Sequence, residues 1–342
     1  MKLSGRFGRL AGSPGFQVAV LLQIACSPYQ SAQNPAGPQA ERLYSLWIFQ
    51  LIVAAVVFFA VIGATVLATR RAARNPELPR LDDAGHGKLT RAVTVATGVT
   101  VLILFASFVH SLTTGRAIAS LPAKSALTIH VTGVQWWWDV EYVDTVPSRR
   151  VVTANEIHVP VGVPVQIIAT AHDVIHSFWV PNLHGKKDLI PGHTTATWFQ
   201  ADTAGLYRGQ CAEFCGHQHA KMALWVVAEP RDAFEKWYAG QLQTPPPPTD
   251  SVTRAGEDVF LSKSCAMCHN IGGTLAGSHV GPDLTHLASR RSIAAGTLAN
   301  TRANLTAWIR DPQRIKPGSR MPATELSSAD LNALVTYLES LK

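Results

Sequence analysis

Apolar and charged positions divide the chain into a membrane part, a β-rich part and a helical part. Residues 43–69 contain no Asp, Glu, Lys or Arg, and neither do residues 92–115. About 20 apolar residues are enough for a helix to span a bilayer. The pattern therefore predicts two transmembrane helices, at about 45–69 and 92–114. A buried helix of a soluble protein is the alternative, and the length of both stretches disfavours it.

Residues 126–230 follow a different pattern. Short apolar runs alternate with Pro, Gly, Asp and Asn, which is typical of strands joined by turns. This spacing predicts an all-β sandwich or barrel of about 100 residues. The expected strands are 126–134, 156–159, 163–169, 195–200 and 223–227, and a short amphipathic helix at 231–241 closes the domain.

Four consecutive prolines within residues 244–250 mark the next boundary. Such a run favours an extended, semi-rigid linker. It separates the β-rich domain, expected over 121–243, from a domain over 251–342 whose apolar residues recur at helical spacing. The expected helices are 251–262, 304–310 and 327–341, the last with Ser327 or Ser328 as its N-cap.

The N-terminus resembles an export signal. Basic residues precede a short apolar run at 16–25. Cys26 then occupies a position like that of a lipoprotein cleavage site. We expect a signal peptide at 1–25 and lipidation of Cys26, and the alternative is a plain signal peptide with an incidental cysteine.

The order of charges predicts how the chain crosses the membrane. A hairpin of the two helices is expected over 26–120. Its connecting loop, residues 70–91, is rich in Lys and Arg, which favours the cytoplasmic side. Both folded domains would then lie on the periplasmic face of a bacterial inner membrane.

Composition adds three constraints. The formal net charge of +7 fits an anionic membrane surface or an acidic partner, and no nucleic-acid partner is expected. The chain has five cysteines, and an odd number in an exported protein argues against a simple disulfide scaffold. It has only four methionines, so a methionine beside other donor groups is informative.

Within the first 240 residues, the densest set of donor groups lies at 211–222, which reads Cys-Ala-Glu-Phe-Cys-Gly-His-Gln-His-Ala-Lys-Met. Sulfur and imidazole together favour copper or zinc. Two thiolates on one loop, Cys211 and Cys215, suggest two coppers that share them, with His219 and Met222 as further ligands. A disulfide between the two cysteines is the alternative, and the histidine and methionine at ligand spacing disfavour it.

A pair of coppers needs a second imidazole. His176 is the first choice because it lies beside strand-like sequence that a β-sandwich can bring next to the 211–222 loop. Spacing alone leaves four competitors open: His172, His184, His193 and His217.

The motif resembles cytochrome c oxidase subunit II. The signature Cys-x-Glu-x-Cys-Gly-x-x-His-x-x-Met stands without a gap at 211–222, and residues 176–181 read His-Ser-Phe-Trp-Val-Pro, like the family's upstream segment. The resemblance covers about residues 40–230. It implies a cupredoxin-like Greek-key sandwich with a dinuclear copper centre. The implied ligands are His176, Cys211, the backbone carbonyl of Glu213, Cys215, His219 and Met222.

The same resemblance implies further roles. Residues 133–138, Gly-Val-Gln-Trp-Trp-Trp, resemble the family's aromatic patch, whose electron-entry position is Trp136. Trp137 is expected to face away from Trp136 and Trp138. The Glu213 carboxylate is implied to bind a magnesium ion shared with subunit I. Many relatives carry an acid at the start of the second membrane helix for a proton channel, and residues 89–94 have none, so that role is not carried over.

The helical domain contains a second redox motif. Residues 265–269 read Cys-Ala-Met-Cys-His, the C-x-x-C-H pattern of covalent haem c attachment through Cys265 and Cys268, with His269 as an axial ligand. The alternatives are a thioredoxin-like pair, which would need a surrounding βαβ pattern, and half of a zinc site, which would need a second pair of ligands. The sequence shows neither pattern, which disfavours both. Residues 251–342 resemble a class I cytochrome c domain. Met321, the only methionine after the motif, is expected as the second axial ligand, with His279 and His286 as rivals.

Together these motifs predict subunit II of a haem–copper oxidase with a fused cytochrome c domain. Electrons from cytochrome c or a cytochrome bc complex would pass through haem c and the two coppers to subunit I. There, oxygen reduction would be coupled to proton pumping, and subunit III is a further expected partner. The alternatives are a carrier that serves a nitric oxide reductase, a copper-delivery protein, and a quinol oxidase subunit. A copper-delivery protein has no use for haem, and quinol oxidase subunits lack the copper ligands present here.

Overall fold

A computed structural model describes residues 28–74, 83–120 and 127–342. The expected signal peptide and the lipidation of Cys26 lie outside the described residues. The chain divides into two compact units. One is a pair of long helices, and the other contains the β-strands and the helices that follow them.

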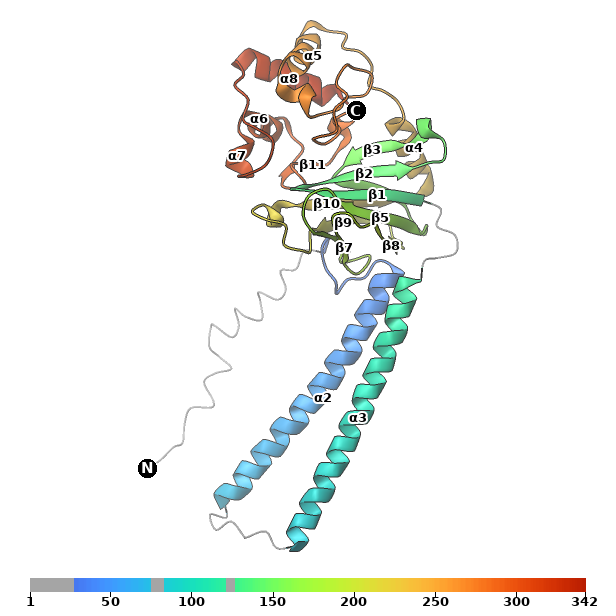
Figure 1. Ribbon diagram of the computed structural model, residues 1–342, viewed down its shortest axis with the longest axis vertical. Helices are drawn as coiled ribbons and strands as arrows, with labels where there is room; N and C mark the ends of the chain where they lie inside the picture. The colour runs from blue at the N-terminus through green and yellow to red at the C-terminus, as the bar shows by residue number, and fades with distance from the viewer. Residues whose placement is uncertain (1–27, 75–82, 121–126) are drawn as a thin grey trace, which may run out of the picture. The chain divides into compact units, whose positions relative to one another are not determined.

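The helix pair consists of α2 (Pro38–Arg74) and α3 (Asp83–Ala119), which run side by side (Figure 1). Both are long and apolar enough to cross a membrane, and their apolar side chains are exposed, whereas a soluble core helix would bury them. Each is longer than the predicted span because backbone hydrogen bonding continues beyond the apolar stretch into the charged flanks. The Arg42 guanidinium donates to the Ala117 carbonyl (3.0 Å) and so links the two helices near one end.

The β-rich domain is the predicted two-sheet sandwich. One sheet has the order β3-β2-β1-β5-β8 and the other has the order β4-β10-β9, with β6 and β7 as a separate pair. The chain passes from the first sheet to the second between β3 and β4 and returns between β4 and β5. Strands that are not consecutive in sequence therefore become neighbours, and two such pairs are parallel, β1 with β5 and β4 with β10. The strands are β1 (Leu127–Val134), β2 (Trp137–Val143), β3 (Val151–Ala154), β4 (Glu156–Pro160), β5 (Val165–Ala171), β6 (His176–Phe178), β7 (Lys187–Leu189), β8 (Thr195–Phe199), β9 (Gly205–Gln210) and β10 (Ala223–Glu229).

Alternating side chains form the core of this sandwich. Every second residue of β2 and of β5 is buried, as the two-residue period of a strand requires. Ile129, Ile157 and Leu224 come from both sheets and are fully buried. The core holds the two sheets together and fixes the loops at their ends, including the loop between β9 and β10.

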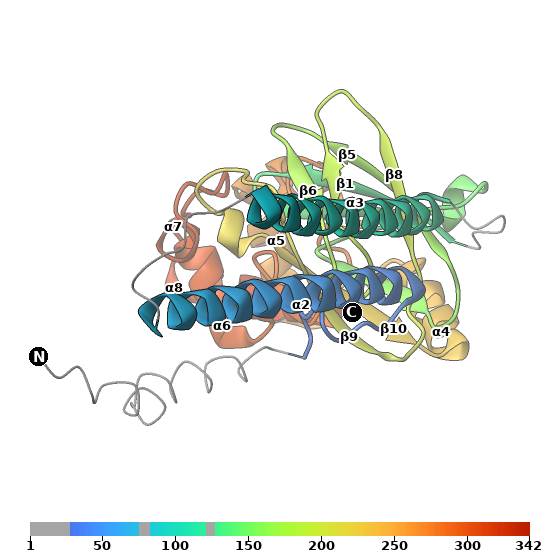
Figure 2. The same ribbon diagram turned by 90° about the horizontal axis from the view of Figure 1, so that it is seen from below.

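The C-terminal part is all-helical apart from the short pair β11 (Ser292–Ile293) and β12 (Leu298–Ala299). Helix α5 begins after Asp250, whose carboxylate accepts hydrogen bonds from two backbone amides, and α8 begins after the Ser327 cap. Helices α5 and α8 pack together at Gly256, where a Cβ atom would lie 2.2 Å from the Ala333 carbonyl oxygen. Figure 2 shows the ribbon of Figure 1 turned by 90° and seen from below. The helices are α4 (Arg231–Gln241), α5 (Ser251–Ser262), α6 (Arg302–Arg310), α7 (Pro312–Ile315) and α8 (Ser328–Ser340), with 3₁₀ turns η1 (Pro147–Arg149), η2 (His219–Lys221), η3 (Ser264–Met267) and η4 (Leu287–Ser289).

Candidate metal and haem sites

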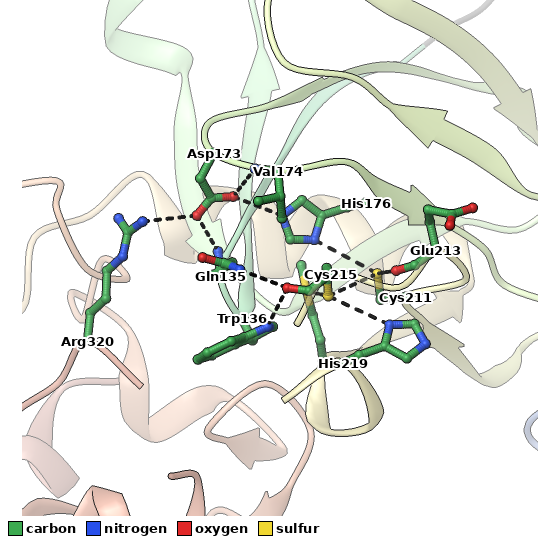
Figure 3. A network of polar contacts seen from close by, with 11 residues as sticks. Gln135, Trp136, Asp173, Val174, His176, Cys211, Glu213, Cys215, His219 and Arg320 are labelled. Atoms are coloured by element: carbon green, nitrogen blue, oxygen red, sulfur yellow. Dashed lines mark hydrogen bonds and ion pairs between the residues drawn. The ribbon is translucent and has the colours of Figure 1, made fainter. Parts of the chain in front are cut away.

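The 211–222 loop connects β9 to β10 and is closed by its own backbone. The Cys211 amide donates to the Met222 carbonyl (2.9 Å), so the two ends of the loop meet. The Ala212 amide donates to the Ser177 carbonyl (3.0 Å), which places the loop against β6. His176 is the first residue of β6, and its imidazole therefore reaches the cysteines (Figure 3).

The six donors predicted for copper lie close to one another. Each thiol sulfur faces one imidazole, and the two sulfurs are neighbours, so the set has two similar halves. The distances are 3.7 Å between the Cys211 and Cys215 Sγ atoms, 3.9 Å from Cys211 Sγ to His176 Nδ1, 3.6 Å from Cys215 Sγ to His219 Nδ1, 3.8 Å from Cys215 Sγ to Met222 Sδ and 3.2 Å from Cys211 Sγ to the Glu213 carbonyl oxygen.

The electrostatics of the thiol pair fit a metal. The hydrogen bond between the two thiols holds the pKa of Cys211 well below its ordinary value and raises the pKa of Cys215. Both side chains are buried. Two thiolates at this separation repel each other, so keeping both ionised needs cations beside them. Soft, redox-active metals such as copper suit two thiolates with imidazole and thioether donors.

Asp173 and Gly133 orient the His176 imidazole. His176 Nε2 lies 3.0 Å from the Asp173 carboxylate, so an N–H there directs the Nδ1 lone pair at the sulfurs. Burial opposes ionisation of Asp173, but hydrogen bonds from His176 and from the Gln135 amide outweigh it and lower the pKa of this carboxyl group. A Cβ atom at Gly133 would lie 2.7 Å from the His176 ring, so only glycine fits. The sequence reading missed both residues, although Asp173 stands three positions before His176.

The four competing histidines differ from His176 in their surroundings. His172, His193 and His217 are exposed. His184 is buried and its ring stacks on Phe178, with centroids 5.1 Å apart. Burial lowers the pKa of His184 to about 4, as expected for a neutral core histidine. Among the described residues, the group of histidines, cysteines and acids close enough to share one ion is His176, Cys211 and Cys215.

A cavity of about 440 Å³ in the helical domain is lined by Cys265, Cys268, His269 and Met321. The His269 ring is fixed by a contact between Nδ1 and the Pro282 carbonyl (2.7 Å), and this leaves Nε2 available. Burial lowers the pKa of His269, which favours the neutral imidazole that a haem iron binds.

The rival axial ligands do not line this cavity. His286 Nε2 instead lies 3.1 Å from the Gln241 carbonyl. A residue that the sequence reading missed does line it: Arg290 is buried, and its Nε has no hydrogen-bond partner among the described residues. An acidic substituent of a bound haem would supply that partner, so the cavity fits the group.

Trp136 lies between the two sites. It lines the cavity, and its indole N–H donates to the Cys215 carbonyl at 2.9 Å.

The expectation that Trp137 faces away from both Trp136 and Trp138 was wrong in one respect. Trp138 is buried in the sandwich core, and Trp137 faces the other way, but Trp137 lines the same cavity as Trp136. Strict alternation applies only within a strand, and β2 begins at Trp137, so Trp136 does not follow it.

Comparisons with known proteins cover both domains. Residues 143–229 match the family model for the periplasmic domain of cytochrome c oxidase subunit II, and residues 253–342 match the cytochrome c model. The cytochrome c oxidase subunit 2 of Alkalihalophilus pseudofirmus is 36% identical, covering 91% of each chain. That of a Bacillus species is 30% identical, covering 96% of each. The solved periplasmic domain of oxidase subunit II from Bradyrhizobium japonicum is 33% identical over 36% of this chain and 96% of that one, with a TM-score of 0.34.

Proposed function

The chain belongs to the cytochrome c oxidase subunit 2 family, and from this premise we propose that it receives electrons at haem c and passes them through a dinuclear copper centre to subunit I. Family membership makes it part of a haem–copper terminal oxidase, an oxidoreductase. Its two domain types imply copper and haem. The proposal adds the order of transfer, the residues and the partners.

The observation that carries the proposal is the position of Trp136. Its indole reaches the Cys215 carbonyl, and its ring lines the cavity that holds Cys265, Cys268 and His269. Bound copper and haem supply one-electron redox chemistry. The chain contributes a short path of buried groups between them and excludes water from it.

The proposed copper ligands are His176, Cys211, the Glu213 carbonyl, Cys215, His219 and Met222. The proposed haem residues are Cys265 and Cys268 as thioether attachments and His269 and Met321 as axial ligands. Asp173 holds the His176 tautomer, and the Pro282 carbonyl holds that of His269. A buried, preorganised donor set changes little on oxidation, which suits electron transfer.

We further propose a magnesium ion at the Glu213 carboxylate, shared with subunit I. This carboxylate points away from the sulfurs in Figure 3, and the Glu213 side chain is 42% exposed. Its exposure supports a role at a contact with a partner. Lys186 lies 3.7 Å from it and would have to move aside to admit the ion.

The complex is proposed to include subunit III and to pump protons as oxygen is reduced. The two apolar helices and the periplasmic-domain match support a membrane protein with an outward-facing domain. A bacterial inner membrane is the proposed location, with a cytochrome c or a cytochrome bc complex as electron donor. In this reading the domains span 121–243 and 251–342, with the linker at 244–250.

Metal and haem analysis of the purified chain tests the proposal. We expect two coppers and one covalent haem c per chain, and an electron paramagnetic resonance spectrum of one unpaired electron shared by both coppers. Rapid reduction should show copper following haem c. A single copper with an ordinary mononuclear spectrum, or haem released by acidic acetone, would contradict the assignment.

A further inference from the structure

The loop that carries Met321 packs against the copper domain. We call residues 315–321 the methionine loop. The Gln218 side-chain amide, within the 211–222 loop, donates to the Pro317 carbonyl at 2.8 Å. Gly318 has a left-handed backbone (φ +82°), and a Cβ atom there would lie 3.7 Å from the Trp136 ring. The two loops that carry the proposed ligands therefore touch each other.

Lys316 anchors the methionine loop from inside the contact. Its side chain is buried, with 3% of the residue exposed. Its ammonium donates to the Trp136 carbonyl at 2.6 Å and to the Ala294 carbonyl at 3.2 Å. Burial lowers the pKa of Lys316 to about 7. Lysine is almost never fully buried without a partner, and here its partners are backbone carbonyls from both domains.

Arg320 anchors the other end of the loop at the surface. Its guanidinium lies 3.2 Å from one Asp173 carboxylate oxygen, and the other oxygen of Asp173 meets His176 Nε2 (Figure 3). The carboxylate that orients a proposed copper ligand thus also contacts the cytochrome domain. Residues Lys316 and Arg320 therefore hold both sides of the loop next to the copper site.

The contact covers the electron-entry tryptophan. Trp136 is only 7% exposed, with the methionine loop against its ring and its carbonyl. We propose that Lys316 and Arg320 are positioning residues that clamp the cytochrome domain over Trp136, fixing the path from haem to copper and closing Trp136 to soluble donor proteins. This inference rests on the proposed function and adds the residues that seat one domain on the other.

Amide hydrogen exchange in the full chain tests the clamp without reference to activity. Two amides outside the methionine loop donate across the contact: Ala223 to the Ala295 carbonyl and Arg291 to the Glu156 carboxylate, both at 3.0 Å. Lys316→Glu sets a carboxylate against the Trp136 and Ala294 carbonyls. We expect about tenfold faster exchange at both amides, the loss expected from one charged hydrogen bond.

Control variants separate undocking from unfolding. Lys342→Glu makes the same charge change at an exposed position of the same domain and should leave both amides protected. Arg320→Glu changes a surface side chain that is 55% exposed. It should speed hydrogen exchange at the same two amides, while the amides of α8 and β1 stay protected. If neither Lys316→Glu nor Arg320→Glu speeds exchange at Ala223 and Arg291, the clamp is wrong.

Stopped-flow reduction by a soluble mitochondrial cytochrome c supplies a second readout. In the unmodified chain, haem c should be reduced first and copper should follow. In Lys316→Glu, a direct phase of copper reduction should appear, which Lys342→Glu lacks. Direct copper reduction in the unmodified chain would overturn the shielding of Trp136. Copper that stays oxidised while haem c is reduced would overturn the proposed order of transfer, and the exchange result would still decide the clamp.

Discussion

At the residue scale, Asp139 shows how the β-sandwich faces the cytochrome domain. It lies on β2, paired with Thr132 of β1 and Ala154 of β3. Burial raises the pKa of its carboxyl group to about 6. His279 of the cytochrome domain acts in the opposite direction, whereas Glu141 and Asp283 add to the rise. The carboxylate is therefore held in a place that favours its neutral form.

This shift predicts the pH dependence of stability. The folded pKa of Asp139 lies above the value of 3.8 for the free side chain, so the folded state binds more protons between about pH 4 and pH 6. Stability should fall as pH rises through that window. Asp139→Asn removes the titration and should raise the free energy of unfolding by about 1 to 2 kcal/mol at pH 7, with little change at pH 4. Thermal unfolding at both pH values checks this, and an equal gain at both would contradict it.

At the element scale, the crossing of α5 and α8 builds the haem domain. Gly256 lets the helices approach so closely that a Cβ atom would also lie 2.6 Å from Tyr337 Cβ. Gly256→Ala should force the helices apart and lower the unfolding free energy of the domain by about 1 to 3 kcal/mol. Gly240→Ala in α4 is the matched control, since nothing lies within 4 Å of its added Cβ, and helix propensity should make it neutral or stabilising. Calorimetry of the two variants compares them, and equal melting temperatures would contradict the role of Gly256.

The helices were easier to predict than the strands. The expected helices at 231–241 and 251–262 match α4 and α5, because caps and apolar spacing are local signals. Strand β2 was not predicted, since Asp139 and Glu141 alternate with its buried residues and break the apolar run. Strand β6 was not predicted either, because three residues give no periodicity and its pairing with β7 defines it.

The candidate site was also predictable only where its signals are local in sequence. Cysteine, histidine and methionine spacing within 211–222 indicates ligands because the loop closes on itself. Neighbouring strand-like sequence favoured His176, but spacing left four competing histidines open, because tertiary packing sets which histidine meets the loop. No local sequence pattern predicts the contact between Lys316 and Trp136, because Trp136 stands 180 residues earlier in the chain. Contacts at that separation follow from how the two domains pack.

At the scale of the whole molecule, three segments that are far apart in sequence meet between the proposed copper and haem sites. They are the aromatic patch at 133–138, the 211–222 loop and the methionine loop, and hydrogen bonds join each to another. The linker at 244–250 connects the domains in sequence but contributes none of these groups. The geometry between the sites should therefore depend on the contact surface, and the linker should mainly keep the domains near each other.

Lengthening the linker tests this division of roles. Inserting seven Gly and Ser residues between Pro246 and Pro247 roughly doubles the linker, and doubling a loop costs only about 0.6 kcal/mol of closure entropy. The docked state should then lose less than about threefold in its equilibrium, and the rate of electron transfer from haem c to copper should change by no more than that. Flash photolysis measures this rate within the chain. Lys316→Glu with the native linker should slow it further than the insertion does, because it weakens the contact itself. A large loss from the insertion alone would instead show that the linker sets the geometry.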